Sequence, residues 1–122
     1  MEQGNLRLYL LRVLLTRDRF DKFKTQIDES VFQSGARDLY KTIGYIYRDN
    51  PNTDSINFSD LKLAYFNTYF PNHSYASQKN IHEIIDNIEN QEPPTDEVVE
   101  TAIKSMYRIK KADELARICL DI

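Results

Sequence analysis

Hydrophobic residues recur along most of the chain at intervals of three and four positions, the pattern of helices that bury one face. The clearest stripe runs from Ser34 to Asp49 and ends at the turn sequence Asn50-Pro51-Asn52. Its apolar members are Ala36, Leu39, Tyr40, Ile43, Ile46 and Tyr47. The opening segment from Leu6 to Leu15 is apolar on nearly every side, so we expect this helix to lie at the centre of the core.

Shorter segments follow the same pattern. A short amphipathic helix is predicted over Asp18 to Ile27, and Val31 and Phe32 are expected to anchor the turn after it. Ser59 is the predicted N-cap of the next helix, because a serine hydroxyl accepts hydrogen bonds from the first free N–H groups of a helix.

Within that helix, Phe58 is expected to pack onto Leu63, and Pro71 is expected to end it. Ser77 is the predicted N-cap of a further helix with one apolar side. That side carries Ile81, Ile84, Ile85 and Ile88. The pattern therefore predicts an all-α fold, a compact bundle of about five or six helices.

The last helix is expected to follow the N-cap Thr95, and its apolar face changes side near Lys110 and Lys111. At about 100° per residue, the two halves carry apolar stripes on roughly opposite sides. The first stripe is Val98, Val99, Ala102, Ile103, Met106 and Ile109, and the second is Leu115, Ile118, Cys119 and Ile122. Two interpretations stay open: a break near Lys111 with both pieces on one core, or a continuous helix that offers its second face to another chain.

Composition and charge narrow the class of protein. With 122 residues, 41% of them hydrophobic, the chain has the size and apolar content of one folded domain. The single cysteine, Cys119, and an opening without a leader pattern indicate a reducing cytoplasm, and no apolar run is long enough to cross a bilayer. A net charge of −3 argues against phosphate neutralisation as the main task, so no sequence-specific nucleic-acid binding is expected.

The residues that would support catalysis are not arranged for it. The glycines stand outside any phosphate-binding loop, and His73 and His82 lack neighbours at metal-ligand spacing, so both are expected at the surface. Cys119 lies in an apolar stretch without an activating base. We therefore expect no enzyme activity, no cofactor and no metal.

A run of acidic residues falls between Lys79 and Lys104 without any basic residue among them. Its members are Glu83, Asp86, Glu89, Glu92, Asp96, Glu97 and Glu100. Such a run is usually a solvated face, and a docking surface for a basic partner is the alternative.

In order, these pieces resemble the N-terminal domain of DnaB-family replicative helicases, especially the divergent members that bacteriophages encode. The most specific segment is IDESVFQSGARDLYKTIGYIYRDN, similar to that family's acidic residue, phenylalanine, long helix and short proline-bearing loop. The other matching segments are LYLLRVLLTRDRFDKF, SINFSDLKLAYF and TDEVVETAIKSMYRIKKADELARICLDI, the last with Arg108 near its middle.

The resemblance implies a single domain over residues 1–122, with a bundle over about 1–90 and a helical hairpin or linker helix over about 95–122. In that family the domain is not catalytic: hairpins pair between subunits in the collar of a hexameric ring, and primase or a helicase loader binds there. Self-association as a dimer or hexamer collar is therefore expected. The candidate partner-binding residues are Ile103, Tyr107, Lys111, Leu115, Ile118 and Ile122.

The motor domain of such a helicase is missing from this chain, so ATP hydrolysis and unwinding would belong to the parent protein. The helicase-binding domain of a primase would produce a similar pattern. A small phage regulator that binds DNA or a host protein is the alternative from a different class.

Overall fold

The computed structural model describes the backbone of residues 3–120 and the side chains of residues 6–112. The predicted all-helical fold is confirmed, with six α-helices, one 3-10 turn (η1) and one π-helical turn (η2) in this range. The elements are α1 Gln3–Val13, α2 Arg17–Phe23, η1 Glu29–Val31, α3 Ser34–Asp49, α4 Phe58–Leu63, η2 Ala64–Tyr69, α5 Tyr75–Glu89 and α6 Asp96–Leu120.

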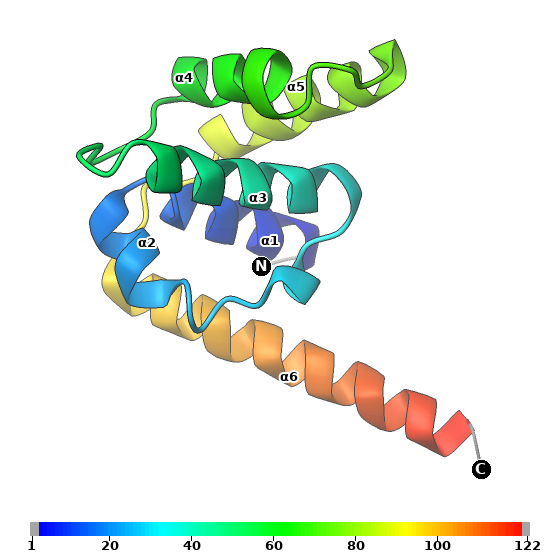
Figure 1. Ribbon diagram of the computed structural model, residues 1–122. Coiled ribbons are helices and arrows are strands. Elements are labelled where there is room, and N and C mark those ends of the chain that lie inside the picture. Colours follow the sequence, from blue (N-terminus) through cyan, green and yellow to red (C-terminus); the bar gives the residue numbers. More distant parts are fainter. Residues whose placement is uncertain (1–2, 121–122) are drawn as a thin grey trace.

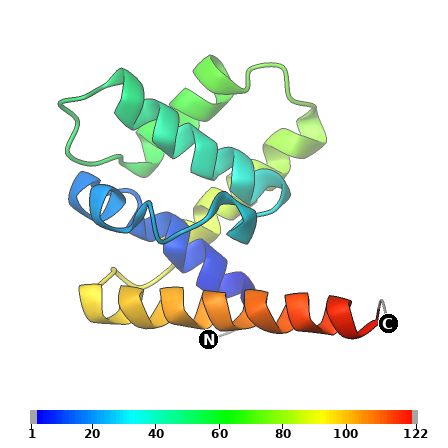
Figure 2. The same cartoon turned by 60° about the horizontal axis from the view of Figure 1, so that its bottom comes forward.

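Helix α1 lies at the centre of the bundle, as its apolar sequence predicts. It contacts α3 and α5 on one side and α6 on the other. Figures 1 and 2 show α6 crossing the base of the bundle and continuing past it. The side chains of Leu10, Leu11, Val13 and Leu14 are fully buried, because this segment has apolar residues on all sides.

Helix α3 has the bounds that its stripe predicts, Ser34–Asp49. Leu39, Ile43, Ile46 and Tyr47 are buried along one side, as that stripe requires. Helix α2 ends at Phe23, earlier than expected, but Ile27 is still buried in the core.

Two predicted N-caps are wrong. Asn57 caps α4 in place of Ser59, since its side-chain oxygen accepts a hydrogen bond from the Asp60 N–H across 2.7 Å. Ser74 caps α5 in place of Ser77, whose own N–H donates to the Ser74 hydroxyl across 3.2 Å. Each helix therefore begins earlier than the sequence pattern suggested.

The earlier start of α4 changes which side chains reach the core. Leu61 is fully buried, whereas Leu63, the expected partner of Phe58, is 61% exposed. Residues that are two positions apart on a helix are separated by about 200° around its axis, so Leu61 and Leu63 cannot lie on the same face. Leu61, and not Leu63, is therefore the leucine of α4 that enters the core.

Helix α6 is one continuous element of 25 residues, which rules out a break near Lys111. The resemblance implied either a helical hairpin or a linker helix in this region. The structure shows a single helix, which packs on α1. Val99, Ala102, Ile103 and Met106 belong to the core, so the bundle extends past residue 90. Val98 is a correction: it is 44% exposed, on the edge of the buried stripe.

Candidate interaction surface

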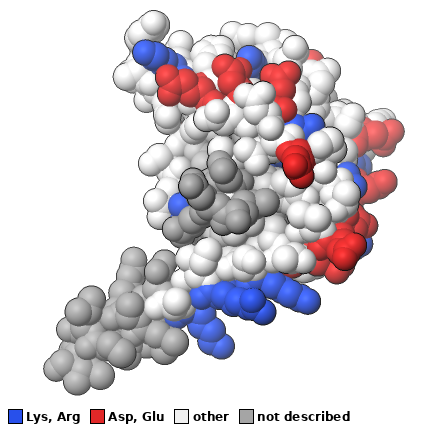
Figure 3. Space-filling view, turned by 180° about the vertical axis from the view of Figure 1, so that it is seen from behind, with Lys and Arg blue, Asp and Glu red and all other residues white. Residues whose placement is uncertain are grey.

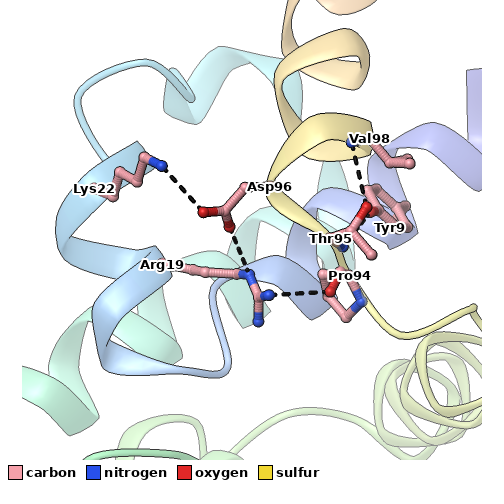
Figure 4. A network of polar contacts seen from close by, with 7 residues as sticks. All are labelled: Tyr9, Arg19, Lys22, Pro94, Thr95, Asp96 and Val98. Atoms are coloured by element: carbon pink, nitrogen blue, oxygen red, sulfur yellow. Dashed lines mark hydrogen bonds and ion pairs between the residues drawn. The ribbon is translucent and has the colours of Figure 1, made fainter.

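The start of α6 is fixed to the bundle by a network of polar contacts (Figure 4). The Asp96 carboxylate accepts hydrogen bonds from Arg19 Nε at 3.3 Å and from Lys22 Nζ at 3.1 Å. The Arg19 guanidinium also donates to the Pro94 carbonyl across 3.0 Å. The predicted N-cap Thr95 is confirmed, since its hydroxyl oxygen accepts from the Val98 N–H at 3.4 Å.

A second set of contacts fixes the middle of α6. The Tyr107 hydroxyl donates to the Gln26 carbonyl across 2.6 Å. Lys110 Nζ contacts the Asp28 carboxylate and the Ser30 hydroxyl, each at 3.2 Å. Lys110 is the last residue of α6 with a described hydrogen bond to another element, so the described attachment covers only the first part of the helix.

Both carboxylates in these contacts have shifted acidities. Hydrogen bonding from Lys22, and then from Arg19, lowers the pKa of Asp96 below its usual value. The pKa of Asp28 is lowered mainly by the Ser30 backbone N–H and then by Lys110. Both groups favour their charged form in the folded chain, so the two attachments of α6 depend on ionised carboxylates.

The candidate partner-binding residues separate into different environments. Ile103 is 5% exposed and packs in the domain's own core, so in this fold it stabilises the bundle and is not available to a partner. Tyr107 is 47% exposed with its hydroxyl bonded to the bundle, and Lys111 is exposed. The side chains of Leu115 and Ile118, and all of Ile122, lie outside the described residues.

The outer face of α6 carries a basic stripe, which we define as Lys104, Arg108 and Lys111. These residues are spaced by four and three positions, and all are exposed. Figure 3 shows the basic side chains in a row along this helix. Continuing the same spacing along the helical backbone reaches positions 115 and 118, so the apolar positions follow the basic stripe on one face.

The acidic run between Lys79 and Lys104 is exposed throughout, and Figure 3 shows carboxylates gathered at the end of the molecule where α6 begins. Asp96 pairs with Arg19 and Lys22, and Asp86 lies 3.4 Å from Lys62 Nζ. No ion pair to the other members is found within residues 6–112. This environment is that of a solvated face.

The two histidines differ. His82 is exposed, as expected, and stacks on Phe66 with ring centroids 4.4 Å apart. His73 is a correction: it is half-buried, and its Nδ1 lies 2.6 Å from the hydroxyl oxygen of the buried Tyr65. The buried hydroxyl needs a hydrogen-bonding partner, and His73 provides it.

Two further observations concern the part of the chain that the structure describes. No group of three or more histidine, cysteine or acidic side chains there is arranged to hold a metal ion. None of its helices combines the length and apolar character that crossing a membrane requires. The side chain of Cys119 lies outside the described residues.

One surface feature escaped the sequence analysis. A groove of about 430 Å³ lies between the end of α3, the loop that follows it, α4 and η2. We call it the η2 groove; its lining includes Ile46, Asp49, Ile56, Asp60, Leu63, Ala64 and Tyr69. The sequence carried one signal of this surface: Leu63 stands two positions after Leu61, so the two side chains lie on different faces of the helix. The structure leaves Leu63 exposed.

Comparisons with known proteins add no relative to this description. No family model matches the chain, and neither does any curated protein or solved structure.

Proposed function

We propose that this chain is a non-catalytic assembly and docking domain of the kind found at the N-terminus of DnaB-family replicative helicases. In this role it would self-associate as a dimer or as the hexamer collar of the parent helicase, and would dock primase or a helicase loader. The order of its helical segments supports the proposal. One structural observation also supports it: α6 is a continuous helix whose first part packs on the bundle and whose second part extends beyond it.

The first part of α6 is committed to the bundle. Val99, Ala102 and Met106 are buried, and Tyr107 and Lys110 bond to the segment before η1. The helix then continues to Leu120 beyond the other elements (Figure 1). The sequence places a second apolar stripe along this later part of the helix, and such a stripe is stabilised when a second surface covers it.

The spacing of that stripe suits docking onto a surface. Leu115, Ile118 and Ile122 stand at positions i, i+3 and i+7, the spacing by which an amphipathic helix places anchors in a partner's groove. They follow the basic stripe on the same face of the helical register. We therefore assign the association surface to the outer face of α6 after Lys104.

The test replaces apolar residues of this face by charges. Leu115→Glu with Ile118→Glu should lower self-association at least about tenfold in sedimentation equilibrium, equivalent to a loss of about 1.4 kcal/mol or more. The matched control is Val98→Glu, an apolar-to-acidic change at a partly exposed position of the same helix. The melting temperature at low concentration should stay near that of the parent chain.

Two results would contradict the proposal. Unfolding of the double variant at concentrations where the parent chain is monomeric would mean that this face packs on its own domain. Unchanged self-association would remove the face from the interface. Because catalysis is assigned to the motor domain of the parent helicase, ATP turnover above background by the purified chain would also count against the proposal.

The basic stripe favours a second candidate, a small regulator that binds DNA. Lys104, Arg108 and Lys111 are exposed on one face, and no ion pair to them is found among the described side chains. Three phosphate contacts would make the logarithm of the DNA affinity fall with a slope of about −2.7 against log salt. Binding to duplex DNA with that slope, abolished by Lys104→Glu, would favour the regulator.

The helicase-binding domain of a primase stays an alternative within replication. It shares the helical pattern, and it differs in its partner. Capture of a complete replicative helicase ring by the purified chain would favour this alternative over the proposal that the chain is a domain of the helicase itself.

A further inference from the structure

We propose that the outer face of α6 of one copy docks into the η2 groove of a second copy, in a head-to-tail contact. This inference rests on the proposed function and deepens it, since it names the surface that receives α6. Its support comes from the shape of the groove, its charge and its position in the fold.

The groove is lined in part by the π-helical turn. In η2 the Phe70 N–H donates to the Tyr65 carbonyl across 2.9 Å, a bond that spans five residues in place of the usual four. Tyr65 is fully buried in the same turn, and Leu63 just before it is 61% exposed at the edge of the groove. Such turns are common at functional sites, because they redirect side chains out of helical register.

The lining of the groove combines apolar, acidic and neutral polar residues, the last being Asn50, Thr53, Ser55 and Thr68. Ile46 and Ile56 are buried members of the core that also line the groove. Its volume of about 430 Å³ falls within the range of binding pockets. Ile46 and Ile56 are 8% and 4% exposed, so Leu63, at 61%, supplies the exposed aliphatic side chain of the groove.

The groove lining contains two carboxylates from different elements. Asp49, at the end of α3, accepts a hydrogen bond from the Tyr69 hydroxyl across 2.6 Å and pairs with Arg48 at 2.9 Å. Asp60, in the first turn of α4, is exposed, and no ion pair to it is found within residues 6–112. A basic side chain of a partner could therefore form an ion pair with Asp60.

The outer face of α6 has the complementary composition. Arg108 and Lys111 precede Leu115 by seven and four positions, so cations and aliphatic anchors share one face. Docking this face of α6 along the groove would bring the exposed Lys111 toward the exposed Asp60. Opposite charges at such a contact speed association and fix its register.

The position of the groove excludes docking within one molecule. Figures 1 and 2 both place the loop after α3 and the end of α6 at opposite ends of the domain. Because α6 is one continuous helix directed away from the groove, its end can reach this surface only on another copy. Contacts between two different surfaces of identical chains build rings where the rotation closes and filaments where it does not.

The test uses two variants that each damage one surface. Leu63→Asp places a charge in the groove and leaves the outer face of α6 unchanged. Leu115→Glu places a charge on the outer face of α6 and leaves the groove unchanged. Each variant alone should self-associate at least about tenfold more weakly than the parent chain. An equimolar mixture should form a one-to-one heterodimer in sedimentation velocity, because the intact groove of one variant receives the intact helix of the other.

A matched control and a charge exchange sharpen the result. Tyr75→Asp is the control for Leu63→Asp, since Tyr75 is 83% exposed and does not line the groove; it should leave association unchanged. Asp60→Lys and Lys111→Glu should each weaken self-association, and mixing these two variants should restore a heterodimer. Both exchanged positions are exposed, so the melting temperatures should stay near that of the parent chain.

The outcomes separate the two proposals. If Leu115→Glu weakens association and Leu63→Asp does not, α6 pairs elsewhere: the head-to-tail contact is overturned and the proposed function stands. If the two single variants fail to associate and also fail to complement each other, the head-to-tail contact is again overturned. A parent chain that is monomeric at the highest attainable concentration overturns both.

Discussion

Gly35 on α3 lies so close to Ile81 on α5 that a Cβ atom on the glycine would stand 2.9 Å from the isoleucine Cδ1 atom. The same Cβ atom would also lie 2.9 Å from Ile84 Cδ1 and 3.0 Å from Asn80 Nδ2. Real Cβ contacts do not come this close, so the ends of these side chains would have to move if position 35 carried a Cβ atom. Helix α3 contacts both α5 and η2, and the end of α3 lines the η2 groove.

The two glycines of α3 should respond oppositely to alanine. Gly35→Ala should lower the free energy of unfolding by about 1 kcal/mol, because overpacking against the buried Ile81 costs about 1–3 kcal/mol and exceeds the helical preference of alanine. Gly44→Ala is the matched control: its Cβ atom would meet nothing within 4 Å, so a gain of about 0.5–1 kcal/mol is expected. Urea melts of both variants measure the difference, and two changes of the same sign would contradict the packing.

Leu14 tests the centre of the core. It is fully buried, so Leu14→Ala should lower the free energy of unfolding by about 2–5 kcal/mol through lost burial and a residual cavity. Leu63→Ala, at an exposed position, should change it by less than about 0.5 kcal/mol. A loss below about 1 kcal/mol for Leu14→Ala in denaturant melts would show that its segment is peripheral.

The attachments of α6 should make stability depend on acidic pH. The pKa values of Asp28 and Asp96 are lowered in the folded chain, so their contribution is complete above the unfolded value of about 3.9 and is lost as pH falls through the lower folded values. Asp28→Asn with Asp96→Asn should therefore destabilise the chain at pH 6. The difference from the parent chain should shrink as pH is lowered toward 2 in thermal melts, and a difference that grows would refute this linkage.

The groove carboxylate Asp49 should titrate unusually low. Hydrogen bonds from Arg48 and Tyr69 lower the pKa of Asp49 to about 2. Tyr69→Phe removes the hydroxyl donor and should raise this pKa toward its ordinary value, as measured from the carboxyl carbon shift in NMR. Tyr45→Phe is the control, because the Tyr45 ring contacts Tyr69 at 5.2 Å between centroids. If Tyr69→Phe leaves the pKa of Asp49 unchanged, the Tyr69 hydroxyl is not a cause of its low value.

The sequence alone predicted the features that depend on neighbouring positions. The bounds of α3, the central place of α1 and the buried stripe in the first part of α6 all follow from apolar spacing at three and four residues, which a single helix already defines. The cap at Thr95 was also predictable, because the donor and acceptor lie three residues apart.

Only the tertiary structure decided which of several local options was used. Asn57 and Ser59 are both good caps, and the choice of Asn57 goes with the burial of Leu61 and the exposure of Leu63. Burial of Ile103 required α1 beside α6, and the η2 groove required the end of α3 beside a π-helical turn. These outcomes depend on contacts between segments far apart in the sequence, and periodicity within one helix carries no information about them.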